Sequence, residues 1–363
     1  MIIRSLIPHL SGIAVDWKYT ARAAVGDHDG GHLGPALMGR GGMGSDFLGT
    51  WRLLSGRAHP GLDSIVDACL RSECSAFWVV AHNEGLRVAH ELATRQSTRP
   101  VHLTVHDDWA GALCARSRRY RLLAPWARSL TRQTLGRVRT FDVVSVGMRD
   151  HYQQLTGLGG AVVHRYLPPS ALLTPPAPVR IAGGELLAGH VGSVYDDGML
   201  FDFLRAFDAQ ARQAGFRARL RLWGSHLTAE RIPPPLRAQV SLLPTLPETE
   251  VISALAKCHF VYAAYPFARR LRLFSRTSLP TKLSTYLQAG RPILGHGPAD
   301  STLADFLGTT ATGVMWTDQN REAGQRAVAK TLGMEIGPGS QEHARQQFFG
   351  EKNLVAMRRA FLV

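Results

Sequence analysis

The sequence predicts an α/β protein of two doubly wound parallel sheets that face a cleft. In both halves of the 363-residue chain, short apolar runs alternate with segments of helical periodicity, which is the pattern of βαβ units. A proline-rich segment at 164–180 separates the halves and indicates an interdomain linker. Hydrophobic residues make up 45% of the chain, so each half can bury a core of its own.

In the first half, four short apolar runs predict strands, at 77–82, 101–106, 141–147 and 162–167. Helical periodicity predicts helices at 84–95 and from Met148 to about Gln154. The first 50 residues fit this alternation poorly. Gly39, Gly41 and Gly44 form a G-x-G-x-x-G pattern, but no strand precedes it and no acidic residue follows at the expected distance. We therefore expect a mobile glycine-rich loop there rather than a dinucleotide site.

The second half repeats the alternation. Strands are expected at 185–194, 218–224, 239–244, 259–265, 291–297 and 312–317, with helices at 198–214, 248–257 and 278–290. A last helix is expected at 341–360. The predicted domains are residues 1–167, a linker at 168–180, residues 181–340, and a C-terminal helix at 341–363.

Several protein classes are excluded. No apolar run reaches the roughly 20 residues that span a bilayer, and the N-terminus is too polar for a signal peptide. We therefore expect a cytoplasmic protein. The four cysteines, Cys69, Cys74, Cys114 and Cys258, have spacings that match no zinc or redox motif, so we expect reduced thiols.

The net charge of +14 is unevenly distributed. Between Trp109 and Phe141 there is no acidic residue, and arginines alternate there with leucines and Trp126. Residues 116–139 therefore read as a basic amphipathic helical stretch, bent near Pro125. Such a surface suits an anionic membrane or a phosphorylated substrate, or is a solvated face without a partner. We expect no nucleic-acid partner, because no known motif frames the stretch.

The segment FSRTSLPTKLSTYLQAGRPILGHG (274–297) is the most informative. We expect a helix with Ser278 as N-cap, Pro280 in the first turn and Gly290 after the last turn. Arg276 and Lys282 would lie where the helix dipole is already positive, which costs about 0.3–1 kcal/mol for a cation. A bound phosphate would remove that cost, so we expect an anion site here.

The segment SLPTKLSTYLQAGRPIL resembles the nucleotide-sugar motif of GT-B glycosyltransferases, especially family 4. Other segments resemble this fold in the expected order, namely RPVHLTVHDDW, FDVVSVGMRDHYQQLTG, HVGSVYDDGMLFDFLRAF, residues 218–225 and VSLLPTLPETEVISALAKCHFVYAAYPF. The resemblance covers roughly residues 75–335. It implies two Rossmann-like domains, an N-terminal acceptor domain, a C-terminal donor domain and a last helix that braces the first domain.

The resemblance also implies site residues. His106 would contact the transferred sugar, unless it merely caps a strand or helix. Asp107 and Asp108 would polarise an acceptor hydroxyl, or would simply begin the next helix, and His82 is either a second acceptor-side residue or a core histidine. The donor would be bound by Gly192, Ser193, Gly224, Ser225, Thr245, Leu246, Arg276, Ser278, Pro280, Thr281, Lys282 and Thr285. No metal ion or other cofactor is expected.

Two departures from the family pattern affect the donor site. Many members carry Arg where this chain has Ser193 and Lys near Asp197 or Gly198; Arg276 and Lys282 would then have to neutralise the diphosphate. The family's ribose-binding Glu falls at Thr285, a weaker anchor because it carries no charge. The usual first strand and glycine-rich turn are also missing, so the chain starts late or diverges there.

The resemblance implies transfer of a sugar from a nucleotide diphosphate to a cell-surface glycan or lipid-linked acceptor, with retention of configuration. The expected partners are this donor, that acceptor and the inner face of the cell membrane. The alternatives are a sugar-nucleotide epimerase or phosphorylase on the same fold, and a non-catalytic nucleotide- or glycan-binding protein.

Overall fold

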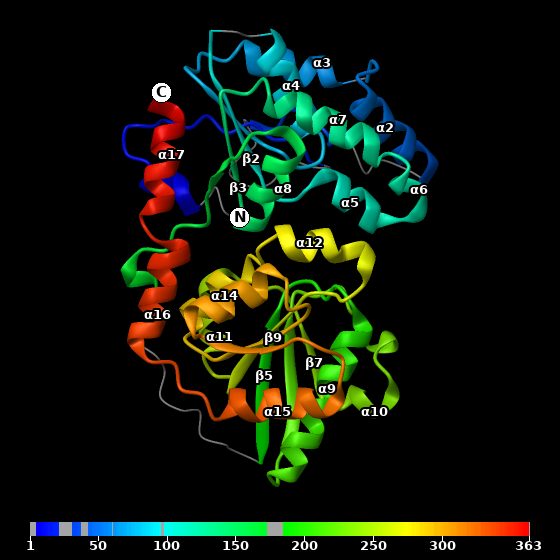
Figure 1. The fold of residues 1–363 in the computed structure, drawn as a ribbon, viewed down its shortest axis with the longest axis vertical. Helices are drawn as coiled ribbons and strands as arrows, with labels where there is room; N and C mark the ends of the chain where they lie inside the picture. The colour runs from blue at the N-terminus through cyan, green and yellow to red at the C-terminus, as the bar shows by residue number, and fades with distance from the viewer. Residues whose placement is uncertain are drawn as a thin grey trace. The chain divides into compact units, whose positions relative to one another are not determined.

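The computed structural model describes residues 5–21, 31–37, 43–59, 61–95, 98–172 and 184–362. The chain forms two compact units, each assembled from separate stretches of sequence (Figure 1). The six-stranded unit holds Met1–Ser5, Arg165–Ser275 and Leu279–Lys352. The four-stranded unit holds Leu6–His164, Arg276–Ser278 and Asn353–Val363.

The six-stranded unit contains one parallel sheet in the order β10-β9-β8-β5-β6-β7. Its strands are β5 (Glu185–Val191), β6 (Arg217–Trp223), β7 (Val240–Leu243), β8 (Phe260–Ala264), β9 (Ile293–His296) and β10 (Gly313–Trp316). The helices between them are α9 (Asp197–Gln213), α10 (Pro234–Arg237), α11 (Glu248–Leu255), α12 (Arg272–Thr277), α13 (Lys282–Ala289), α14 (Thr302–Thr310), α15 (Arg321–Leu332) and α16 (Pro338–Ala344). Parallel strands joined by helices confirm the predicted doubly wound sheet.

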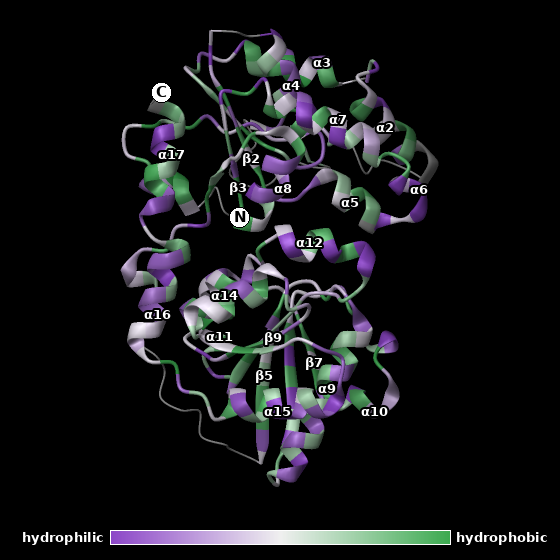
Figure 2. Ribbon diagram, viewed as in Figure 1, coloured by the Kyte–Doolittle hydropathy of each residue, from purple (hydrophilic) through white to green (hydrophobic). Residues whose placement is uncertain are grey.

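Each face of this sheet has its own hydrophobic core. On one face, Phe203 and Phe207 of α9 pack against Phe260 and Tyr262 of β8, with ring centroids of Phe203 and Tyr262 4.0 Å apart. On the other face, α11, α13 and α14 contribute a second cluster that includes Tyr286. Most strands of this sheet are therefore mainly apolar, whereas β6 (RARLRLW) alternates arginine with apolar residues, and Figure 2 shows both green and purple along the strands.

The four-stranded unit contains a parallel sheet in the order β1-β2-β3-β4. Its strands are β1 (Phe77–Val80), β2 (Val101–Val105), β3 (Thr140–Val143) and β4 (Ala161–Val162). The helices are α2 (Met43–Ser55), α3 (Leu62–Leu70), α4 (Gly85–Arg95), α5 (Trp109–Arg116), α6 (Arg118–Arg121), α7 (Ala124–Leu135), α8 (Val146–Thr156) and, from the far end of the chain, α17 (Lys352–Leu362). Within this unit, Phe361 of α17 lies against Trp78 and His102, with ring centroids 5.3 and 5.4 Å apart.

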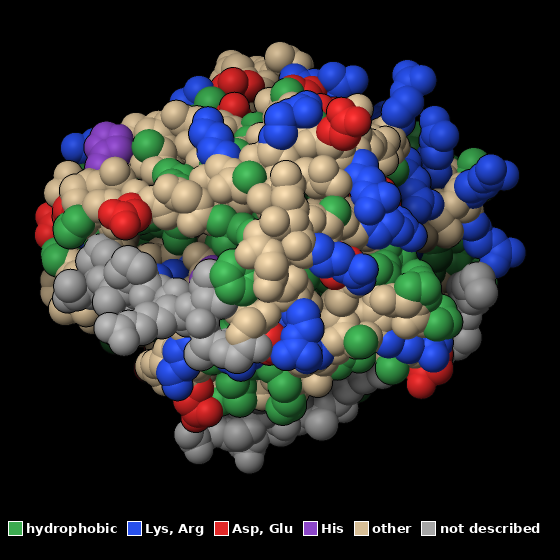
Figure 3. Space-filling view, turned by 90° about the horizontal axis from the view of Figure 1, so that it is seen from below, with side chains coloured by type: hydrophobic (Ala, Val, Ile, Leu, Met, Phe, Trp, Pro, Cys, Tyr) green, Lys and Arg blue, Asp and Glu red, His purple; other side chains and the backbone are tan. Residues whose placement is uncertain are grey.

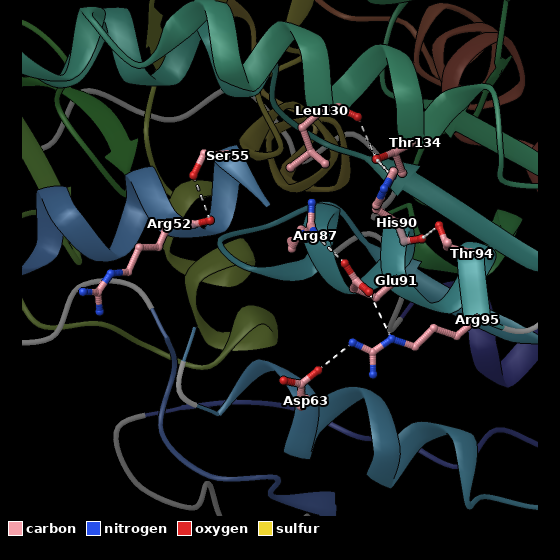
Figure 4. Close-up of polar contacts among 10 residues, drawn as sticks. All are labelled: Arg52, Ser55, Asp63, Arg87, His90, Glu91, Thr94, Arg95, Leu130 and Thr134. Carbon is pink, nitrogen blue, oxygen red and sulfur yellow. Dashed lines mark hydrogen bonds and ion pairs between the residues drawn. The ribbon is translucent and has the colours of Figure 1, made fainter. Parts of the chain in front are cut away.

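Ion pairs tie α3 to α4 (Figure 4). Arg95 donates to Glu91 on its own helix at 3.1 Å and to Asp63 of α3 at 2.6 Å. Arg87 lies 2.5 Å from Glu91, and both side chains are largely buried. Because Glu91 serves two arginines, its carboxylate is the centre of this cluster.

Three expectations about local structure are corrected. The stretch 116–139 is not one bent helix but the last residue of α5 followed by the separate helices α6 and α7. Ser117 is extended and caps α6, while Pro125 lies in the first turn of α7, a position that proline tolerates. The strand expected at 141–147 ends at Val143, because Ser145 caps α8. The helix expected at 341–360 is interrupted at Gly350, where an added Cβ would lie 2.8 Å from the Gln346 carbonyl oxygen.

The chain passes from the four-stranded to the six-stranded unit between His164 and Arg165. Of the expected linker, residues 173–180 lie outside the described residues. Gly39 and Gly41 of the expected glycine-rich loop also lie outside them, and Gly44 lies in α2. Across the described ranges, every helix is too short or too polar to cross a bilayer.

Candidate functional site

The most promising site of the six-stranded unit lies where strand order reverses. From β5 the chain adds β6 and β7 on one side and then β8, β9 and β10 on the other. Ligands of doubly wound folds bind beyond the carboxyl ends of the strands at this switch point. A pocket occupies this position, lined by His190, Ser193, Val194, Tyr195, Asp196, Met199, Leu200, Tyr262, Ala264 and Pro266.

The backbone leaves β5 through a glycine that keeps this edge open. Gly192 has φ +81°, and an added Cβ would meet no atom within 4 Å. Its N–H donates to the Trp223 carbonyl at 2.8 Å, which fixes the turn. The next residue, Ser193, presents its carbonyl oxygen to Lys282 Nζ at 3.3 Å. The structure thus brings together Gly192, Ser193 and Lys282, three of the residues selected from the sequence.

Lys282 is the only lysine near the switch point among the described residues. It is partly buried, and its Nζ lies 3.1 Å from His190 Nε2 and 5.8 Å from the centroid of the Tyr195 ring. No carboxylate of the described residues is within ion-pair distance of this nitrogen. Burial lowers the pKa of Lys282 to about 7, because a charged ammonium is poorly solvated there.

The helix that carries Lys282 begins later than the sequence indicated. The helix α13 starts at Lys282 with Thr281 as N-cap, and the Thr281 side chain makes no capping hydrogen bond. A helix cannot run through 278–281 because Pro280 disfavours helical conformation at Leu279. Ser278 is therefore not the N-cap; its hydroxyl donates to Asp107 Oδ1 at 2.9 Å within the four-stranded unit.

The remaining cation of the expected anion site, Arg276, is exposed and belongs to the four-stranded unit with Ser278. Lys282 belongs to the six-stranded unit. Arg272, three residues after Arg269, pairs with Asp300 at 2.8 Å. Lys282 is therefore the cation that the six-stranded unit itself places at its switch point.

A second group of predicted residues follows β6, which pairs with β5, and β7, which pairs with β6. Gly224 has φ +63°, and an added Cβ would lie 3.0 Å from Thr245 Oγ1. Ser225 accepts a hydrogen bond from the Leu227 N–H at 3.1 Å, and Leu246 packs against the core. Gly224 and Thr245 therefore lie side by side at the same edge of the sheet.

Sequence reasoning missed Glu248, the first residue of α11. Thr285 Oγ1 donates to Glu248 Oε1 at 3.5 Å, and Arg165 forms two hydrogen bonds with the same carboxylate, one at 2.8 Å. Burial is the largest single influence and alone would raise the pKa of Glu248, but the hydrogen bonds and charge of Arg165, together with smaller contributions such as the Thr285 hydrogen bond, hold that pKa below its usual value. A charged carboxylate therefore stands beside Thr285, where the sequence showed only a hydroxyl.

The acceptor-side residues follow β1 and β2 in the four-stranded unit. Among the described residues His106 Nε2 has no hydrogen-bond partner although it is buried, and burial lowers the pKa of His106 in spite of Asp142 and Asp107 nearby. Asp108 caps α5 through Gly111 N–H at 2.6 Å and accepts from Tyr152 at 3.2 Å, so it begins the helix. His82 is exposed.

No metal centre is apparent in these surroundings. Within the described ranges, no three His, Cys, Asp or Glu side chains come close enough together to hold an ion. The described groups at the two strand edges include one lysine, Lys282, and the carboxylates of Asp107, Asp196 and Glu248.

No protein-family model and no curated protein matches the sequence. Solved structures do match it. TarM aligns with a TM-score of 0.62 and 10% identity over 84% of this chain. A Staphylococcus aureus TarM variant in complex with Fondaparinux, alpha-GlcNAc-glycerol and UDP also gives a TM-score of 0.62, at 11% identity over 84% of this chain and 59% of its own.

The lipopolysaccharide outer core galactosyltransferase WaaB aligns with a TM-score of 0.56 and 12% identity, over 83% of this chain and 80% of its own. The chain spans 59% of the length of TarM. At these identities the alignments establish a shared fold.

Proposed function

We propose that this chain, which has the fold of GT-B glycosyltransferases, transfers a sugar from a nucleoside diphosphate to a glycan or lipid-linked acceptor. One observation carries the proposal. A partly buried lysine at the switch point, Lys282, has no carboxylate counter-ion among the described residues. A diphosphate would supply the missing negative charge, both in the donor and as the leaving group.

The donor half of the proposal uses the edge of the six-stranded sheet. Gly192 and Ser193 let the backbone approach the diphosphate closely, and Gly224, Ser225, Thr245 and Leu246 line the nucleoside side. Thr285 carries no charge, but the neighbouring Glu248 is a charged hydrogen-bond acceptor. Together Glu248 and Thr285 would bind the ribose hydroxyls. Asp196 and Asp197 at the start of α9 make the N-terminus of that helix a poor phosphate site. Lys282 is therefore the main group that neutralises the diphosphate.

The acceptor half of the proposal uses His106 and Asp107. A neutral histidine with a buried, unpartnered Nε2 can hydrogen-bond a sugar hydroxyl, and the Asp107 carboxylate can polarise the attacking hydroxyl. We propose no metal ion or other cofactor. Retention of configuration follows from the family resemblance and is part of the proposal.

A basic surface on the four-stranded unit supports an acceptor held at a membrane. Arg118, Arg119, Arg121, Arg128 and Arg132 are exposed on α6 and α7, and the exposed fractions of Leu122 and Trp126 are 67% and 43%. Figure 3 draws the molecule from below the view of Figure 1, and Lys and Arg side chains are widespread on that face as well. Exposed apolar side chains among arginines suit an anionic lipid surface, so we propose peripheral binding at the inner face of the cell membrane.

The first experiment measures nucleotide binding. Nucleoside diphosphates and their sugars are screened by thermal shift on the wild type, Lys282→Ala and Lys257→Ala, the last replacing an exposed lysine as a control. We expect one donor to stabilise the wild type and the control, and to stabilise Lys282→Ala much less. Equal stabilisation of all three proteins would refute the donor site.

The second experiment measures transfer. The selected donor, radiolabelled in its sugar, is incubated with cell-envelope lipid extract and with the wild type or His106→Ala. We expect label in the lipid or glycan fraction with the wild type only. Conversion of the donor without an acceptor would indicate an epimerase, and donor binding without any product would indicate a binding protein.

The third experiment measures membrane binding by sedimentation with vesicles of anionic or neutral phospholipid. We expect binding to anionic vesicles that decreases with salt, and loss of binding when Leu122 and Trp126 are both replaced with serine. An unchanged bound fraction in the double variant would refute a role for these side chains.

A further inference from the structure

His190 is a buried histidine at the carboxyl end of β5, with 2% of its surface exposed. Its Nδ1 lies 2.8 Å from the Tyr262 carbonyl oxygen. A carbonyl oxygen only accepts hydrogen bonds, so Nδ1 carries the hydrogen. Burial, and then the charge of Lys282, lower the pKa of His190 to about 3, so the ring is neutral. Its Nε2 therefore presents a lone pair.

Lys282 Nζ is held by acceptors on the β5 side of the pocket. It lies 3.1 Å from the Nε2 lone pair of His190 and donates to the Ser193 carbonyl oxygen at 3.3 Å. His190 Nε2 and Ser193 O are themselves 3.3 Å apart, and since both are acceptors, the lysine bridges them. Two neutral acceptors orient the Lys282 nitrogen without neutralising its charge.

The His190 ring is itself fixed by the strands. The Tyr262 carbonyl that holds Nδ1 also accepts from Tyr286 Oη at 2.8 Å, and Tyr286 Oη accepts from the Val191 N–H at 3.2 Å. Tyr262 and Tyr286 are at most 1% exposed. A rotation of the ring would break this chain of hydrogen bonds, so the lone pair keeps its direction.

The groups that contact the Lys282 nitrogen carry no negative charge. From β5 it meets His190, and from the following loop it meets the Ser193 carbonyl and the Tyr195 ring. Tyr262 of β8 and Tyr286 of α13 contact His190 or β5 through their polar atoms. Asp196, which lines the same pocket, accepts from the Met199 N–H at 3.2 Å. Lys282 thus has hydrogen-bond acceptors but no counter-ion among the described residues.

We propose that His190 is a positioning residue that aims Lys282 at the anion, and that the anion and a proton bind to this lysine together. The role rests on the proposed function, in which Lys282 meets a diphosphate. Burial keeps the pKa of free Lys282 near 7, so part of the lysine is uncharged at neutral pH. An approaching anion favours the charged form, and by linkage a proton binds with it.

Two variants separate the contacts of His190. In His190→Asn the side-chain amide N–H replaces Nδ1 and keeps the bond to Tyr262, but nothing replaces the Nε2 acceptor. In His190→Gln the longer side chain carries an amide oxygen near the position of Nε2. Circular dichroism and thermal melting establish that both variants fold.

The first measurement is the reactivity of each lysine toward acetic anhydride between about pH 6 and pH 10, read by peptide mass spectrometry. Lys18, Lys257 and Lys330 are internal references. We expect Lys282 of the wild type and His190→Gln to be half-reactive near pH 7. In His190→Asn the midpoint moves up by at least one pH unit, because the released side chain reaches solvent. Equal midpoints in the wild type and folded His190→Asn would overturn the positioning role.

The second measurement adds sulfate, whose charge is constant over this pH range. We expect sulfate to protect wild-type Lys282 from acetylation, with a half-protecting concentration that rises up to about tenfold per pH unit above pH 7. In His190→Asn that concentration is at least fivefold higher at pH 7 and changes less with pH. Absence of protection in the wild type would overturn the joint binding of anion and proton. Protection without sugar transfer would refute the proposed function and leave this inference standing.

Discussion

Replacing His296 with glutamine removes a pH-dependent part of the stability of the six-stranded unit. His296 ends β9 with 1% of its surface exposed. Its ring stacks on Trp316 with centroids 3.7 Å apart, and its Nδ1 lies 3.0 Å from Tyr262 Oη. Burial lowers the pKa of His296 to about 4, because a charged imidazolium would be poorly solvated between these rings.

The sign and size of the effect follow from this shift. In the unfolded chain the histidine takes up its proton near pH 6.5, and in the folded chain near pH 4. Above pH 6.5 both states are neutral and the histidine has no effect. As the pH falls from 6.5 to 4, the unfolded state alone gains a proton, so the free energy of unfolding decreases. A difference of about 2.5 pKa units corresponds to about 3 kcal/mol.

The assay is urea unfolding of the wild type and His296→Gln at a series of pH values, followed by tryptophan fluorescence. We expect the wild type to lose about 3 kcal/mol more than the variant between pH 7 and pH 4. At pH 7 the variant is the less stable protein, because glutamine does not reproduce the ring stack. Parallel pH profiles for the two proteins would show that His296 is not held neutral by burial.

Three further predictions concern other parts of the structure. Lys282→Met raises the melting temperature relative to the wild type, and the increase is larger at pH 6 than at pH 10. The reason is that burying the charged lysine costs stability only below the pKa that Lys282 has in the unfolded chain. An equal increase at both pH values would contradict the lowered pKa of Lys282. Glu91→Gln, which removes the carboxylate between two arginines, lowers the free energy of unfolding by about 1–2 kcal/mol, measured by urea titration. Asp202→Asn, which removes the partly exposed partner of Arg205, changes it by less than about 0.5 kcal/mol in the same assay. Gly313→Ala would place its Cβ 2.0 Å from the Ile293 carbonyl oxygen, so its free energy of unfolding falls by at least about 3 kcal/mol. Gly308→Ala in α14 has no neighbour within 4 Å, so its free energy of unfolding rises by up to about 1 kcal/mol. Similar calorimetric melting temperatures for these two variants would contradict the clash at Gly313.

The sequence predicted the sheets well because most of their parallel strands are runs dominated by apolar residues. The expected strand at 101–106 is observed at Val101–Val105, and the one at 259–265 at Phe260–Ala264. The helices before β1 were not predicted. Their apolar residues are spread among glycines and polar residues, and their packing depends on partners distant in sequence, such as Tyr120, which donates to Asp46.

The site was predicted in part. Two cations, Arg276 and Lys282, at the start of an expected helix indicated an anion site, and of these Lys282 lies together with Gly192 and Ser193 in the structure. Two partners were missed, His190 and Glu248. His190 is hidden in an apolar strand, and its role depends on the direction of one carbonyl group. Glu248 lies 37 residues before Thr285, and no local pattern connects them.

The place of α17 at the far end of the chain has a consequence during synthesis. The β1–β4 sheet is complete in sequence once residue 162 has been made, but the helix that lies against Trp78 and His102 is encoded at 352–362. On the ribosome, Trp78 and His102 therefore stay uncovered by this helix while almost two hundred further residues are synthesised. A nascent chain with an exposed tryptophan and an uncovered His102–Asp142 pair is a natural client for a chaperone.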